Sequence, residues 1–157
     1  TLENVAIADE TGVKHLHKIA FSQSRWATGL ASFNRATLEA EIKRGYVDEQ
    51  AKREGIIPPT NLEDYFTTEP VDCTTISDLL VKHQFPQLDL LQIDTEGYDF
   101  EIIKTVDFTQ FKPKIISFEH QHLSPKDTIA CQTLLDKQGY TILKKGRDSI
   151  AYSTVGR

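Results

Sequence analysis

The spacing of apolar and polar positions divides the chain into a regular part and an irregular part. From Val71 onward, short apolar runs alternate with amphipathic stretches. The runs at 88–94 (LDLLQID) and 114–120 (KIISFEH) are nearly continuous in apolar residues, which is typical of strands covered on both faces. Strands that alternate with helices indicate an α/β fold with a parallel sheet.

Helices are expected before, between and after these two runs. The first follows Thr75, which has an acid three residues later in the spacing of a capping box, and Pro86 ends it. The next starts at Gly97. The last is framed by Ser124 at its start and Gly139 past its end. Each helix has an apolar stripe that faces a core.

The C-terminal region predicts a hairpin. Two strand-like stretches, 140–145 (YTILKK) and 149–153 (SIAYS), are separated only by the short turn GRD. Because this connection is too short to contain a crossover helix, the two strands must be antiparallel. A mostly parallel sheet that ends in an antiparallel hairpin is a narrow fold class.

The N-terminal region is less regular. Residues 3–9 predict a buried strand and residues 13–19 a more exposed one. The polar stretch 22–70 has weak periodicity, with helices expected only near 34–44 and 47–55. A long irregular stretch inside a compact domain is more often functional than part of the core. We therefore expect a single domain, with three parts: a strand and turn at 1–21, a lid or insertion at 22–70, and the main sheet at 71–157.

Composition narrows the classes of function. The formal net charge is −5, which disfavours non-specific binding to nucleic acid. No apolar run is long enough for a membrane span, and the first residues do not have the basic-then-apolar pattern of a leader, so secretion is not expected. The two cysteines, Cys73 and Cys131, lack zinc-site spacing, so reduced thiols in the cytoplasm are expected. The chain has no methionine and opens on TLENVAIADE, which suggests a fragment.

Candidate functional residues follow from the sheet. In open α/β sheets, ligands bind outside the carboxyl ends of the strands. Asp94 and Glu96 end one expected strand, Glu119 and His120 end the next, and Asp9 ends the first. A helix N-terminus also favours acids, so capping alone is the competing interpretation for Asp94 and Glu96.

The triplet HQH at 120–122 allows two interpretations. Its two histidines, with Asp94 or Glu119, could hold a divalent ion. The spacing does not provide a complete set of metal ligands, so no metal site is assigned. His120 is the better candidate for a general base, because the ordinary pKa of an imidazole lies near 6.5. The motifs GxGxxG, Walker A and GxSxG are all absent from the sequence.

Several of these segments resemble FkbM-type S-adenosylmethionine-dependent methyltransferases. The resemblance rests on LDLLQIDTEGYDFEIIK, PKIISFEH, LLDKQGYTI and DSIAYS, and on NVAIADETG near the N-terminus. It implies a class I, Rossmann-like methyltransferase sheet whose first and second strands are absent from this chain. It also implies methyl transfer from S-adenosylmethionine to a hydroxyl of a sugar, polyketide or similar small molecule.

The resemblance also assigns roles to residues. Asp94 would lie at the edge shared by cofactor and acceptor, and Glu96 and Gly97 would form the turn into the next helix. Glu119 and His120 would lie near the acceptor, and Asp9 near the adenine end of the cofactor. The proton of the hydroxyl would pass to His120 or Asp94.

Two other functions stay open at this stage. One is a metal-dependent hydrolase that uses Asp94, Glu119, His120 and His122. The other is a non-catalytic α/β module that binds a partner through its lid. The acceptor is expected to be a small molecule or glycan, not nucleic acid or membrane, and self-association into a homo-oligomer is left open.

The absent strands lead to a prediction about cofactor affinity. In the family's sheet they separate the strand at 3–9 from the strand at 88–94, and the loops after them hold the cofactor. We expect this chain alone to bind S-adenosylmethionine weakly, and the edge near Leu88 to be exposed. Calorimetric titration of the chain tests this, and a dissociation constant in the range of about 1 μM would contradict it.

Overall fold

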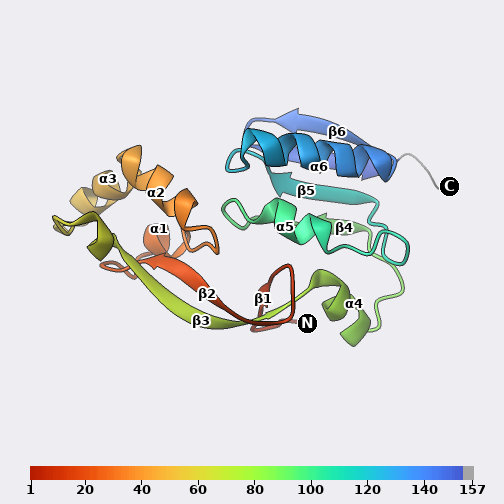
Figure 1. The fold of residues 1–157 in the computed structure, drawn as a ribbon, viewed down its shortest axis with the longest axis horizontal. Helices are drawn as coiled ribbons and strands as arrows, with labels where there is room; N and C mark the ends of the chain where they lie inside the picture. Colours follow the sequence, from red (N-terminus) through yellow and green to blue (C-terminus); the bar gives the residue numbers. More distant parts are fainter. Residues whose placement is uncertain (154–157) are drawn as a thin grey trace. The chain divides into compact units, whose positions relative to one another are not determined.

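The computed structural model describes residues 1–153, which fall into two compact units. The first unit contains Thr1–Gly12 and the chain from Asp72 onward, and the second contains Val13–Val71. Helices and strands alternate along most of the chain (Figure 1).

A four-stranded sheet forms the centre of the first unit. Its order is β4 (Leu90–Gln92), β5 (Ile115–Glu119), β7 (Asp148–Ser153) and β6 (Tyr140–Lys145). β4 and β5 are parallel, whereas β7 is antiparallel to both β5 and β6. The expected α/β fold with a C-terminal antiparallel hairpin is therefore confirmed, and β4 is an edge strand of this sheet, as expected near Leu88.

Two helices cover one face of this sheet. α5 (Asp99–Lys104) and α6 (Pro125–Lys137) run across the same side in Figure 1. Their apolar residues share one core with the inward-facing residues of the strands. The core includes Leu91, Ile93, Phe100, Ile103, Ile116, Phe118, Leu135 and Ala151.

The expectation that β4 and β5 are covered on both faces is wrong for the first unit. Leu90 of β4 is 51% exposed and its register partner Ile115 of β5 is 40% exposed. Leu143 and Ile150, also register partners, are 57% and 41% exposed. Helices pack on only one side here, so alternate strand positions lie open.

A second sheet has the order β1 (Ala6–Ile7), β3 (Phe66–Thr74) and β2 (Gly12–Ile19). β1 is shorter than the expected strand at 3–9 and pairs in parallel with the end of β3, with Ala6 opposite Cys73. The sequence does not predict β3, because Pro70 lies inside it. Proline is tolerated where a strand has a free edge, and β1 reaches only Cys73 and Thr74.

The second unit has a hydrophobic core of its own, so the stretch expected to be irregular is ordered. It contains α1 (Arg25–Thr28), α2 (Arg35–Lys43), α3 (Tyr46–Arg53) and a short 3₁₀ helix at Leu62–Tyr65. The core consists of Ile19, Ala27, Leu30, Leu38, Val47 and Tyr65. Both expected helices are confirmed, and the side chain of Asn34 caps α2 by accepting from the N–H of Ala36.

Capping residues also define the helices of the first unit. The Thr75 hydroxyl accepts from the N–H of Asp78 at the start of α4 (Ile76–Lys82), and Ser124 accepts from Asp127 at the start of α6. α4 ends before the expected Pro86, because Gln84 adopts a left-handed conformation with φ of 55°.

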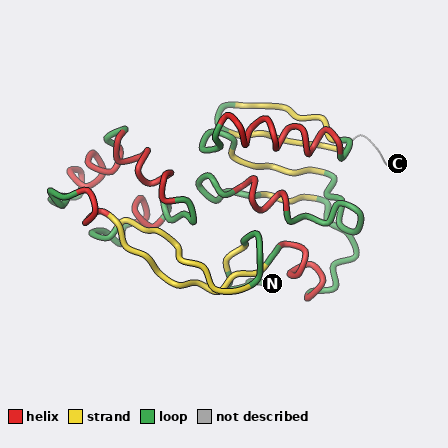
Figure 2. Tube along the Cα trace, in the orientation of Figure 1, coloured by secondary structure: helices red, strands yellow, loops and turns green. Residues whose placement is uncertain are grey.

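Within the described part of the chain, no helix combines the length and the apolar character that a membrane crossing requires. Figure 2 shows the helices and strands along the backbone trace.

The buried thiol of Cys131 gives the first structural prediction. Burial raises the pKa of this α6 thiol to about 12, so little reactive thiolate exists near neutral pH. In a Cys73→Ala variant we expect the native protein to react very slowly with a thiol-specific disulfide reagent, and the urea-unfolded protein to react at once. Native labelling as fast as unfolded labelling would contradict this.

Candidate functional site

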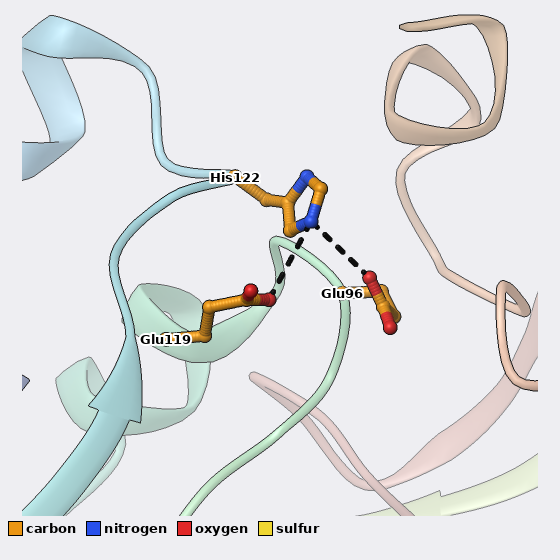
Figure 3. A group of neighbouring side chains, drawn as sticks. All are labelled: Glu96, Glu119 and His122. Carbon is orange, nitrogen blue, oxygen red and sulfur yellow. Dashed lines mark ion pairs between the residues drawn. The ribbon is translucent and has the colours of Figure 1, made fainter. Parts of the chain in front are cut away.

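Three side chains converge at the carboxyl ends of β4 and β5 (Figure 3). Glu96 lies in the loop between β4 and α5, Glu119 is the last residue of β5, and His122 lies in the loop before α6. His122 Nε2 is 3.4 Å from Glu96 Oε2 and 3.6 Å from Glu119 Oε2. The three side chains, called here the carboxylate–histidine cluster, offer ligand atoms that all lie within 4.8 Å of one another.

The buried carboxylate of Asp99 holds the two strand ends together. Its Oδ2 accepts two hydrogen bonds from Thr95, one from the hydroxyl at 2.8 Å and a longer one from the backbone N–H at 3.3 Å. Its Oδ1 accepts from the N–H of Glu119 at 3.0 Å. Asp99 is fully buried at the start of α5, so one side chain joins the β4–α5 loop to the end of β5. Glu96 and Glu119 are thereby kept close.

The cluster carries an excess of negative charge. Burial raises the pKa of the Glu119 carboxyl, and the nearby charges of Glu96, Asp94 and Asp99 raise it further. His122 acts in the opposite direction by stabilising the ionised carboxylate. This arrangement favours a cation or a proton between the carboxylates.

The two histidines of the triplet have different surroundings. His120 Nδ1 lies 3.0 Å from the Ser149 hydroxyl of β7, and its backbone N–H donates to the carbonyl of Arg147. His122, not His120, lies between Glu96 and Glu119. The role of His120 as a general base stays a prediction, with its ring oriented by Ser149.

The remaining expected site residues lie around the same loop. Asp94 is exposed two residues after the end of β4, and its charge acts on Glu119. Glu96 and Gly97 both have left-handed backbones, with φ of 49° and 92°, and make the sharp turn toward α5. Asp9, after β1, accepts a 2.6 Å hydrogen bond from the Tyr98 hydroxyl. The structure thus brings Asp9 beside the loop that carries Asp94, Glu96 and Gly97.

Sequence reasoning missed Asp99 and Tyr98 as parts of this site. The sequence places Tyr98 only within the helix expected after Gly97, with no indication that it contacts Asp9. Asp99 follows it at a position where an acid has an ordinary explanation as a favourable charge in the first turn of a helix. Its partner Glu119 is twenty residues away in sequence, so no local spacing indicates the contact.

The Asp99 carboxylate leads to a stability prediction. Asp99→Ala leaves the Glu119 N–H and the Thr95 hydroxyl without their acceptor in a buried place, so we expect a loss of about 2–3 kcal/mol in the free energy of unfolding. Urea unfolding followed by circular dichroism measures it. Asp89→Ala is the matched control, because the side chain of Asp89 forms an exposed ion pair with Lys114. Equal effects of the two changes would contradict the role of Asp99.

Comparisons with known proteins identify the family. The model of the methyltransferase FkbM domain matches residues 2–142, which is most of the chain. Searches among curated proteins and among solved structures gave no match. The match includes β1 to β5 and the whole carboxylate–histidine cluster, and it ends within β6. The family is one of methyltransferases, and this chain belongs to it.

Proposed function

We propose that this protein is an S-adenosylmethionine-dependent O-methyltransferase that acts on a hydroxyl of a small molecule or sugar. Family membership supports methyl transfer, and hence S-adenosylmethionine as the donor. The observation that carries the proposal is the acidic edge at the ends of β4 and β5. There Asp94, Glu96 and Glu119 surround the place where α/β sheets bind their ligands.

The strand order supports a finer assignment of the fold. We infer that β4, β5, β7 and β6 are the C-terminal half of a class I, Rossmann-like methyltransferase sheet, which has this order and this antiparallel hairpin. In that arrangement the first and second strands of the sheet are absent from the chain. β1 pairs with β3 in the described residues, which gives it a partner without those strands.

The residues present suit a positively charged methyl donor. The carboxylates of Asp94 and Glu96 complement the charge of a sulfonium, and Asp9, held by the Tyr98 hydroxyl, is the acid proposed to lie near the adenine end of the cofactor. Gly97, with φ of 92°, has no side chain to block a ligand at the turn. S-adenosylmethionine, when bound, supplies an activated methyl group.

The protein's own contribution is to position the acceptor and accept a proton. An oxygen–carbon bond forms while the sulfur–carbon bond of the donor breaks, and the hydroxyl proton must go to a base. The exposed carboxylate of Asp94 and the imidazole of His120 are the two groups that can accept it. Holding the acceptor against the methyl group supplies the rest of the rate enhancement.

The family match favours this function over the other two. Hydrolysis by a metal-activated water uses similar residue types, but the family is one of group-transfer enzymes. Nothing in the described residues specifically supports a non-catalytic partner-binding module.

Methyl transfer and the identity of the base can be tested together. The protein is incubated with radiolabelled S-adenosylmethionine in excess and a panel of hydroxyl-bearing metabolites, and products are analysed by mass spectrometry. We expect methyl ethers as products. Replacing the base, through Asp94→Asn or His120→Gln, should lower kcat/KM by about 100-fold.

The pH profile separates the two candidates for the base. If His120 is the base, His120→Gln removes the dependence of the wild-type rate on pH between about 5 and 8, and if Asp94 is the base it does not. Asp136→Asn, on the exposed side of α6, is the control and should leave kcat/KM unchanged. Products methylated only on nitrogen, sulfur or carbon would contradict the proposal.

A further inference from the structure

The geometry of the carboxylate–histidine cluster suits a metal ion better than it suits hydrogen bonding. At 3.4 Å and 3.6 Å, the contacts of His122 Nε2 with the two carboxylates are longer than good hydrogen bonds. Ligand atoms bound about 2.1 Å from one ion stand about 3.0–3.4 Å apart. Small side-chain movements would therefore place all three atoms around a common centre.

The surroundings of the cluster meet two further requirements of a metal site. The side chains of Glu119 and His122 are only 11% and 12% exposed, and Glu96 is 28% exposed, so the site is shielded yet open on one side. Glu96 and Glu119 hold two carboxylates within 4.8 Å of each other, so their negative charges repel. A bound cation would remove that repulsion.

The backbone around the ligands is held in place. Asp99 binds the N–H of Glu119 and the hydroxyl of Thr95, the residue before Glu96. Asp99 thus fixes the backbone of Glu119 and of the residue before Glu96, and it is not itself a ligand. A backbone that is already held in place limits the rearrangement that ion binding requires.

We propose that Glu96, Glu119 and His122 bind a divalent transition-metal ion of the type of Mn²⁺ or Zn²⁺. Two carboxylate oxygens and one imidazole nitrogen suit these ions, whereas Ca²⁺ takes more oxygen ligands and Cu⁺ prefers sulfur. Three protein ligands leave coordination positions for a small molecule.

The role of the ion rests on the proposed function. An acceptor hydroxyl that reaches the open side is polarised by the ion, which lowers the pKa of that hydroxyl. The proton then leaves to Asp94 or His120, and the oxygen bonds to the methyl carbon while the sulfur–carbon bond of the donor breaks and the donor leaves as a thioether. The acceptors favoured by such a site have two neighbouring oxygens, as in vicinal diols and hydroxy acids, because a chelating pair fills two open positions.

Binding is tested without any methyl transfer. Mn²⁺ is titrated into the metal-free protein, and the free ion is followed by electron paramagnetic resonance, with Zn²⁺ as competitor. We expect one Mn²⁺ per chain, displaced by Zn²⁺. Glu119→Gln and His122→Ala should each raise the dissociation constant at least about tenfold. Circular dichroism verifies that each variant is folded.

Two control variants define the outcome. His15→Ala removes an exposed histidine of β2 and should leave Mn²⁺ binding unchanged, and His120→Ala should do the same, because His120 contacts Ser149 instead of the cluster. Binding weaker than about 1 mM, or binding lost in His120→Ala but kept in His122→Ala, would overturn the proposal.

A separate assay distinguishes the two proposals from each other. Methyl transfer that persists in a strong chelator, together with no Mn²⁺ binding, overturns the metal site and leaves the methyltransferase function in place. Saturable Mn²⁺ binding through His122 without any methyl transfer supports the metal site and contradicts the proposed function.

Discussion

The buried carboxylate of Asp99 is the contact on which the candidate site depends. Parallel strands end at the same edge, but their loops diverge unless something links them. Asp99 does so by accepting from Thr95 on one side and from the Glu119 N–H on the other. A buried carboxylate is stable only when it is well hydrogen-bonded, and here the bonds that satisfy it also define the site.

This link has an electrostatic consequence. The Asp99 link brings the carboxylates of Glu96 and Glu119 together in a partly buried place. Burial raises the pKa of Glu119, and the negative charges of Glu96, Asp94 and Asp99 raise it further. Folding alone does not favour such a concentration of like charge. The two ligands proposed for this edge, the sulfonium of a methyl donor and a divalent metal ion, are both positively charged and would offset this repulsion. The chain belongs to a family of methyltransferases, which supports the methyl donor as one of these ligands.

The sheet that carries this site in the first unit is covered by helices on only one face. α5 and α6 bury one face, while Leu90, Ile115, Leu143 and Ile150 remain exposed on the other. The two-residue strand β1 pairs in parallel with β3, whose partner residues lie more than sixty positions later in the sequence. The core of this unit is built jointly by the buried side chains of α5 and α6 and by the inward-facing side chains of the strands.

The sequence by itself determined what depends on neighbours along the chain. The caps at Thr75 and Ser124, the C-terminal hairpin and the position of acids at the strand ends follow from local spacing. Only the tertiary structure decided which distant groups meet. It selected His122 over His120 as the partner of the carboxylates, and it gave Asp99 its role. The physical reason is that capping and strand alternation act over a few residues, whereas these contacts depend on how separate strands pair and on the loop conformations that the pairing allows.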